Sequence, residues 1–145
     1  MTIELTMAAA AIALGLVQML LTALELRRVH GVAWANTARD TPSGQPDSPL
    51  LGRLSRAQAN LMETLPFFLG LVLVLEIADA TTGTTALASV GFVAARVVYV
   101  PLYAFGIPWL RGAVWMLSLV SLAVLAWAAL AIGDWAGAVA ALGIG

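Results

Sequence analysis

The sequence predicts an all-α membrane protein, built as an up-and-down bundle of four transmembrane helices. Hydrophobic residues make up 61% of the chain and charged residues 10%, with a mean hydropathy of +0.95, whereas about a quarter of the residues in soluble domains are charged. Two stretches without a charge, Leu5 to Leu24 and Gly112 to Gly133, are each long enough for the roughly 20 residues that a membrane-spanning helix needs. Only one connection is long, and short connections make successive helices antiparallel.

The first span is expected at about residues 3–26. The segment before it, MTIEL, contains Glu4 and no basic residue, so it lacks the positive region of a cleavable signal peptide. A long loop at about residues 27–55 follows the first span. Its segment from Thr41 to Pro49 holds three prolines and a glycine, which neither flanking helix can include in its interior.

The second and third spans each contain a charge deep within an apolar run. The second span, at about residues 57–78, contains Glu63, and the third, at about residues 84–104, contains Arg96. The fourth span is expected at about residues 111–133. The connections between these spans are short, and the length supports a single domain over residues 1–145.

Charged residues outside the spans divide between the two sides of the predicted bundle. The basic ones lie at the long loop or at the turn between the third and fourth spans, and they are Arg27, Arg28, Arg39, Arg53, Arg56 and Arg111. The acidic residues on the other side are Glu4, Glu76, Asp79 and Asp134. By the positive-inside rule, the Arg-rich loop faces the cytoplasm and both termini face outward.

The chain has no cysteine and no lysine, and its one histidine is His30. Thiol nucleophiles, disulfides, lysine Schiff bases and Cys/His metal clusters are therefore excluded, and no metal is expected. If the protein performs thiol chemistry, the sulfur must arrive with a ligand. Nothing in the sequence resembles a nucleic-acid-binding patch. A Ser-His-Asp triad around His30 is conceivable, but without a nucleophile elbow we expect a structural or interfacial histidine.

Polar side chains form a stripe on each of the two middle spans. Positions i, i+4 and i+7 of a helix share one face, so Arg56, Asn60 and Glu63 align. With a rise of about 1.5 Å per residue, Glu63 lies roughly 10 Å inside a membrane boundary near Arg56, and Arg96 lies at a matching depth. The stripe on the third span consists of Arg96, Tyr99 and Tyr103.

A lone Arg or Glu at the bilayer centre costs about 2.5–3.5 kcal/mol on insertion scales. We therefore expect Glu63 and Arg96 to form an ion pair that faces the bundle interior. The hydrogen-bonding groups expected around this pair are Asn60, Tyr99 and Tyr103. Such a pair could serve only to hold two helices together. However, Arg56 and Arg111 lie at the mouth of the same stripes, and their surplus positive charge favours an anionic ligand.

The segment RAQANLMETLPFF, residues 56–68, resembles the second-helix signature of the MAPEG family, the membrane-associated proteins of eicosanoid and glutathione metabolism. The matching pattern R-x-Q-x-N-x-x-E-x-x-P consists of Arg56, Gln58, Asn60, Glu63 and Pro66. The segment ARVVYVPLYAFGIPWLRG, residues 95–112, is similar to the family's third helix and its turn into the fourth. The resemblance covers nearly the whole chain, and points to a prokaryotic member similar to microsomal glutathione transferase or leukotriene C synthase.

This resemblance implies a left-handed four-helix bundle that assembles as a homotrimer in a bacterial inner membrane. Glutathione would be a cosubstrate, bound between adjacent subunits near the cytoplasmic side. Arg111 corresponds to the fourth-helix arginine that stabilises the glutathione thiolate, and is therefore the implied catalytic residue. The residues implied to bind glutathione are Arg56, Gln58, Asn60, Glu63, Arg96, Tyr99 and Tyr103.

Three functions are compatible with these features. The first is a glutathione-dependent membrane enzyme that conjugates glutathione to lipophilic electrophiles or reduces lipid hydroperoxides, with a membrane-dissolved small molecule as its second substrate. The second is a non-catalytic lipid-binding or scaffold protein, because one branch of the family binds lipid without catalysis. The third is a small transport protein with Glu63 and Arg96 on a permeation path, against which the short loops and the single charge pair argue.

Overall fold

The computed structural model describes residues 1–133, and these residues form helices and connections with no strand. The four long helices are α1 (Ile3–His30), α3 (Pro49–Ile77), α4 (Gly83–Phe105) and α5 (Pro108–Ala131), and a single turn, α2 (Val32–Ala35), lies in the long loop. All four are long and apolar enough to cross a membrane. The predicted all-α fold with four membrane spans is confirmed.

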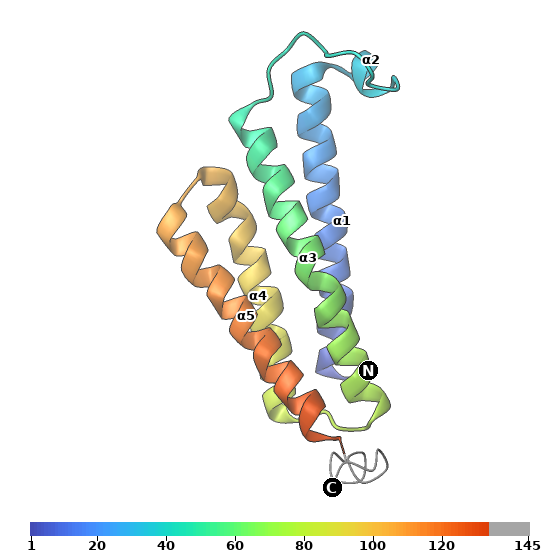
Figure 1. Cartoon of the computed structure of the whole chain (residues 1–145), viewed down its shortest axis with the longest axis vertical. Coiled ribbons are helices and arrows are strands. Elements are labelled where there is room, and N and C mark those ends of the chain that lie inside the picture. The colour runs from blue at the N-terminus through green and yellow to red at the C-terminus, as the bar shows by residue number, and fades with distance from the viewer. Residues whose placement is uncertain (134–145) are drawn as a thin grey trace, which may run out of the picture.

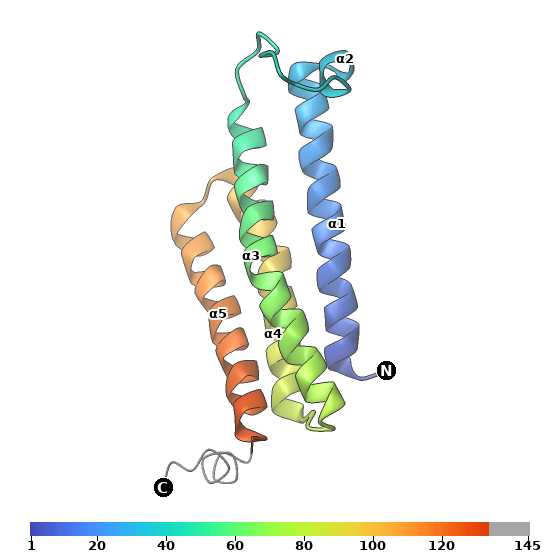
Figure 2. The same ribbon diagram turned by 45° about the vertical axis from the view of Figure 1, so that its right-hand side comes forward.

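The long helices run up and down (Figures 1 and 2). Residue 1 and the end of α5 lie at one end of the bundle, and the loop that contains α2 lies at the other. We call these the terminal end and the loop end. At the loop end, α1 and α3 extend beyond the turn that joins α4 to α5.

The first two long helices extend further toward the loop end than predicted. Helix α1 continues through Arg27 and Arg28 to His30, and α3 begins at Pro49 rather than near residue 57. The start of α3 has a local cause, because the Ser48 side chain accepts a 3.0 Å hydrogen bond from the backbone N–H of Leu51. Proline is favoured in the position that follows such a cap. The connection between α1 and α3 therefore spans residues 31–48 instead of 27–55.

The apolar core lies in the half of the bundle near the terminal end. Its largest buried side chains include Phe68 and Leu75 of α3, Phe92 of α4 and Leu125 of α5. The Phe68 and Phe92 rings stack with centroids 4.2 Å apart. Small residues such as Ala11 bring α1 close to the same cluster. This packing fixes α3 against α4 and so sets the position of the polar residues nearer the loop end.

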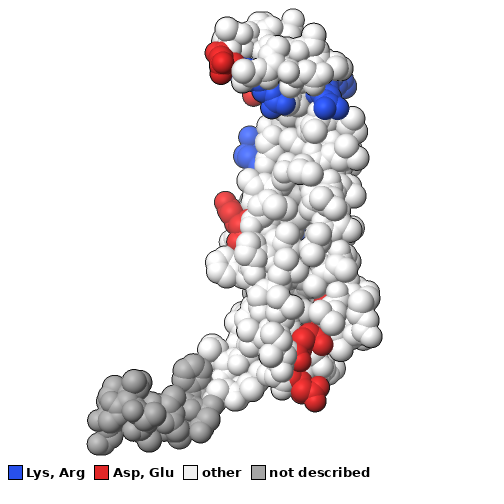
Figure 3. Space-filling view, turned by 90° about the vertical axis from the view of Figure 1, so that its right-hand side faces the viewer, with Lys and Arg blue, Asp and Glu red and all other residues white. Residues whose placement is uncertain are grey.

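The outer surface of the bundle is apolar. Large hydrophobic side chains such as Phe67, Leu87 and Ile77 are 68%, 73% and 85% exposed, which a soluble monomer rarely tolerates over a wide area. Figure 3 shows arginines near the loop end, acidic residues near the terminal end, and between them a mostly uncharged surface with one acidic group at its edge. The chain is an integral membrane protein.

Candidate functional site

Arg96 is the largest fully buried side chain among the described residues, with 1% of its surface exposed. Helix α4 directs it toward α3, where its Nη1 donates a 2.5 Å hydrogen bond to Oδ1 of Asn60. Its Cζ also lies 5.4 Å from the ring centroid of Phe92 and 5.6 Å from that of Tyr99. These aromatic faces attract a cation when water is excluded. The predicted contact between the two polar stripes therefore exists, and Asn60 makes it.

Two further nitrogens of Arg96, Nε and Nη2, are buried without a hydrogen-bond partner among the described residues. A buried donor that lacks an acceptor costs about 1–3 kcal/mol, and more when it is charged. Arg96 therefore retains the capacity to bind an acceptor such as a carboxylate.

The predicted ion pair between Glu63 and Arg96 is wrong. No ion pair of Glu63 within 4.0 Å occurs in the described part of the chain, and its side chain is exposed. Glu63 lies about 160° around α3 from Leu61, which is 1% exposed and faces the interior. The carboxylate therefore points toward the surface of the bundle.

Tyr103 joins three helices at the loop-end side of Arg96. Its hydroxyl oxygen accepts a 3.2 Å hydrogen bond from Nε of Arg56 on α3. On the other side, Cζ of Arg111 in α5 lies 4.7 Å from the Tyr103 ring centroid. The Tyr99 ring packs edge-on, with centroids 5.3 Å apart. Two guanidinium groups from different helices thus meet at one phenol ring.

The structure brings most of the predicted site residues together. We define the arginine–tyrosine cluster as the group formed by Arg56, Asn60, Arg96, Tyr99, Tyr103 and Arg111. Arg56 is exposed and Arg111 is half-buried, whereas Arg96 is enclosed. The cluster therefore has cations both at its surface and in its interior, an arrangement that suits a ligand with more than one anionic group.

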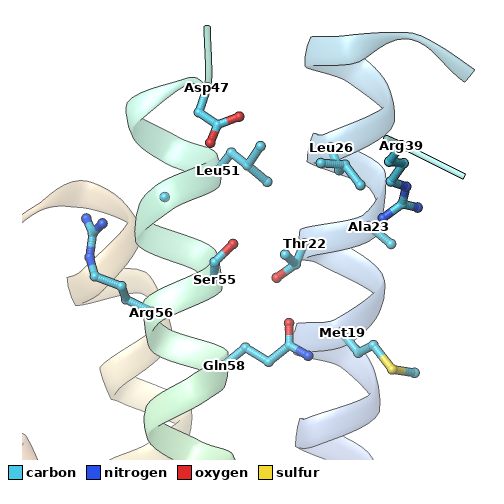
Figure 4. Close-up of a pocket in the computed structure, with 11 residues that line it drawn as sticks. Met19, Thr22, Ala23, Leu26, Arg39, Asp47, Leu51, Ser55, Arg56 and Gln58 are labelled. Atoms are coloured by element: carbon cyan, nitrogen blue, oxygen red, sulfur yellow. The ribbon is translucent and has the colours of Figure 1, made fainter. Parts of the chain in front are cut away.

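Gln58 lies apart from the arginine–tyrosine cluster. Side chains two positions apart on a helix point in directions that differ by about 200° around its axis. Figure 4 shows Gln58 reaching toward α1 while Arg56 points to the other side of α3. Gln58 lines a hollow of about 570 Å³ between α1 and α3, together with Thr22 and Ser55. The two side chains therefore point in different directions, although Arg56 also lines this hollow.

Arg53 makes a contact that the sequence did not reveal. Its Nη1 donates a 3.1 Å hydrogen bond to the backbone oxygen of Ala104, near the end of α4. The sequence predicts only that Arg53 is one of the positive charges near the mouth of the two polar stripes. The available signal was its position one turn before Arg56, which places both arginines on the part of α3 that leads to the cluster.

His30 joins α1 to the long loop. Its Nδ1 lies 2.5 Å from Oγ of Ser43 and its Nε2 lies 2.8 Å from Oδ1 of Asp47, while the ring packs against Trp34 with centroids 4.7 Å apart. These three residue types match a hydrolytic triad, but Asp47 is exposed and all the contacts serve to fix the loop. Among residues 1–133, no group of three or more His, Asp or Glu side chains could hold a metal ion.

A comparison with known protein families identifies one family that this chain matches. The model of the MAPEG family matches residues 5–131, which include nearly all of the four long helices. No curated protein matches the chain, and no solved structure matches it.

Proposed function

Because the chain belongs to the MAPEG family, we propose that it is a glutathione-dependent membrane enzyme. In this proposal it conjugates glutathione to lipophilic electrophiles or uses it to reduce lipid hydroperoxides. The family includes glutathione-dependent transferases and related proteins. Membership of the family therefore supports glutathione-dependent chemistry, and we propose that this chemistry takes place at the arginine–tyrosine cluster.

The observation that carries the proposal is the excess of positive charge in the cluster. Arg56, Arg96 and Arg111 converge on Asn60 and the two tyrosines, and within residues 1–133 no ion pair joins any of the three to a carboxylate. Each uncompensated charge within a membrane span is costly. An anionic ligand would offset that cost, and would accept hydrogen bonds from the two Arg96 nitrogens that have no partner within residues 1–133.

Glutathione matches these groups in chemistry. Its two carboxylates suit guanidinium donors, which bind carboxylates through paired N–H groups. In the proposal, Arg56 and Arg96 bind the carboxylates, and the exposed Glu63 binds the ammonium group. The side chains of Asn60, Tyr99 and Tyr103 provide further hydrogen-bonding groups.

Arg111 is the proposed activator of the thiol. A free thiol with a pKa near 8.5 is only a few per cent ionised at pH 7. A neighbouring guanidinium favours the thiolate, and lowering the thiol pKa by one unit is worth about 1.4 kcal/mol. Arg111 can supply this charge without losing its proton, because guanidinium stays ionised even when partly desolvated.

The thiolate then attacks the second substrate directly, without a covalent enzyme intermediate. In conjugation, the sulfur forms a bond to an electrophilic carbon and the leaving group departs with its electron pair. In peroxide reduction, the thiolate attacks one peroxide oxygen and releases an alcohol after protonation. The glutathione sulfenic acid that results is reduced by a second glutathione, which yields glutathione disulfide and water.

We further propose that the protein acts as a homotrimer, which would give Gln58 a role. Gln58 reaches toward α1 and away from Arg56 of its own chain (Figure 4). A ligand held between adjacent subunits could be contacted by the cluster of one chain and by Gln58 of the next. The exposure of Glu63 and Arg56 on α3 is consistent with a site that a neighbouring chain completes.

The proposed location is a bacterial inner membrane with the loop end in the cytoplasm. The exposed Arg27, Arg28 and Arg39 all lie at the loop end, and positive residues favour the cytoplasmic side. Glutathione would enter the cluster from that aqueous side. Lipophilic substrates would reach the sulfur from the membrane, through the apolar outer surface of the bundle.

A thiolate titration tests the proposal. Purified protein in detergent is mixed with glutathione, the ultraviolet absorbance of the thiolate is followed, and a chloronitrobenzene is then added. We expect a thiolate signal and conjugation, and in Arg111→Ala a loss of the signal with retained glutathione binding. The matched control is Arg27→Ala, because Arg27 is exposed and its side chain has no bond within residues 1–133. Unchanged chemistry in Arg111→Ala would remove that residue from the mechanism.

The alternative function is non-catalytic lipid binding, which two apolar hollows favour. One, of about 200 Å³, lies between α1 and α3 and includes Leu16 and Met62. The other, of about 300 Å³, lies between α4 and α5 and includes Leu87 and Leu117. Lipid that stays bound through purification, with neither thiolate signal nor conjugation, would support this function instead of the enzyme.

A further inference from the structure

A side chain from α3 holds the turn between α4 and α5. Arg53 donates from Nη1 to the backbone oxygen of Ala104 at 3.1 Å, in the last turn of α4, where carbonyl groups have no partner within the helix. The same guanidinium packs on Gly106, where an added Cβ would lie 3.0 Å from Cζ and 3.1 Å from both Nη atoms. Arg53 thus makes two separate contacts with one turn.

Gly106 is the residue at which the chain changes direction. Its φ of 74° and ψ of 36° place it in the left-handed region, which glycine adopts without steric cost. Helix α5 begins two residues later at Pro108, and Arg111 lies in its first turn. The direction in which α5 leaves this turn therefore determines where the Arg111 guanidinium lies relative to the Tyr103 ring, 4.7 Å away.

We infer that Arg53 is a positioning residue for thiol activation: by fixing the α4–α5 turn, it holds Arg111 against Tyr103. This inference rests on the proposed function, in which Arg111 stabilises the thiolate. Both contacts of Arg53 depend on the breadth of the guanidinium, because one nitrogen reaches Ala104 while the rest of the group covers Gly106. A lysine keeps the charge, but its compact ammonium group lacks the planar breadth of a guanidinium and cannot make both contacts at once.

The variant Arg53→Lys distinguishes a positioning role of Arg53 from an effect of its positive charge alone. The full chain in detergent is titrated with pH while the thiolate absorbance of bound glutathione is recorded. In Arg53→Lys and in Gly106→Ala we expect the apparent pKa of the bound thiol to rise by about one unit, so that the thiolate fraction below that pKa falls about tenfold. We expect kcat to fall by a similar factor. The Kd for glutathione should change less than about threefold, because the proposed carboxylate contacts lie on α3 and α4.

Arg27→Lys is the matched control, because Arg27 is an exposed arginine at the same end of the molecule. Its thiol pKa and kcat should equal those of the parent protein. If Arg53→Lys also matches the parent, charge alone suffices and the positioning role is refuted, while the proposed function stands. If the parent protein gives no thiolate signal, the proposed function itself fails, and thiol activation fails with it.

A second measurement does not depend on glutathione. The chain has no cysteine, so spin labels can be attached specifically at Ser55→Cys and Trp109→Cys, two exposed positions on α3 and α5. We expect a narrow distance distribution in the parent protein and a broader or shifted one when Arg53→Lys is added. An unchanged distribution would show that Arg53 does not fix the turn, whatever the variant does to activity.

Discussion

The bond between Asn60 and Arg96 can be tested by removing its acceptor. In Asn60→Ala, the buried guanidinium loses its only hydrogen-bond partner in the described part of the chain. Water cannot readily replace the lost acceptor, because Arg96 is 1% exposed. A hydrogen bond to a charged group contributes about 1.5–3 kcal/mol, so we expect the free energy of unfolding to fall by about 2 kcal/mol. Tryptophan fluorescence during a titration with denaturing detergent measures this change.

A second variant at the same position separates stability from ligand binding. Asn60→Asp places a carboxylate beside Arg96 and keeps an acceptor, so we expect the free energy of unfolding to be maintained. The same carboxylate neutralises Arg96, so the affinity for glutathione should fall at least tenfold. Asn36→Ala is the control, because Asn36 is an exposed asparagine of the loop. A loss below about 0.5 kcal/mol in Asn60→Ala, which is the usual range for surface substitutions, would refute the reasoning.

Three further predictions follow from single contacts. Tyr103→Phe removes the hydroxyl that accepts from Arg56, and should weaken glutathione binding about fivefold by calorimetry, since one such bond contributes about 1 kcal/mol; unchanged affinity would contradict this. Asp47→Asn weakens the link to His30, so limited proteolysis should cut residues 31–48 faster than in the parent protein. Ser48→Ala removes the cap of α3 and should lower the free energy of unfolding by about 1 kcal/mol in a detergent titration.

Much of the fold is predictable because hydropathy determines it directly. Each of the four apolar runs is long enough to cross a membrane, and each forms a helix that includes the expected span or nearly all of it. The predicted ends of the helices were less accurate, because local capping interactions, and not hydropathy, determine where a helix begins or ends. Ser48 followed by Pro49 is a start signal that can be read from the sequence, but it lies in a polar segment that the hydropathy argument assigned to the loop.

For the candidate site, the sequence predicted which residues share a helix face, but it did not predict which side chains contact each other. Spacings of three, four and seven residues correctly placed Arg56 and Asn60 on the side of α3 that meets α4. The partner of Arg96 depends on how far α3 is rotated about its own axis, which the large buried residues of the core determine. That rotation brings Asn60 to Arg96 and leaves Glu63 at the surface. The same periodicity shows that Gln58 lies on the opposite side of α3 from Arg56.

The bundle divides into two halves, and this division accounts for the proposed position of the ligand toward the loop end. Near the terminal end, Phe68 and Phe92 fill the interior with stacked rings, so the packing there needs no other molecule. Toward the loop end, the interior between α3 and α4 contains Arg96 and Tyr99, and Arg96 has two buried donors without a partner in the part of the chain that the structure describes. An anion that accepts from these donors stabilises the folded chain by an amount that grows with its concentration relative to its Kd. The proposed ligand binding would therefore be coupled to the stability of this polar half, whereas the apolar half holds the four helices together without a ligand.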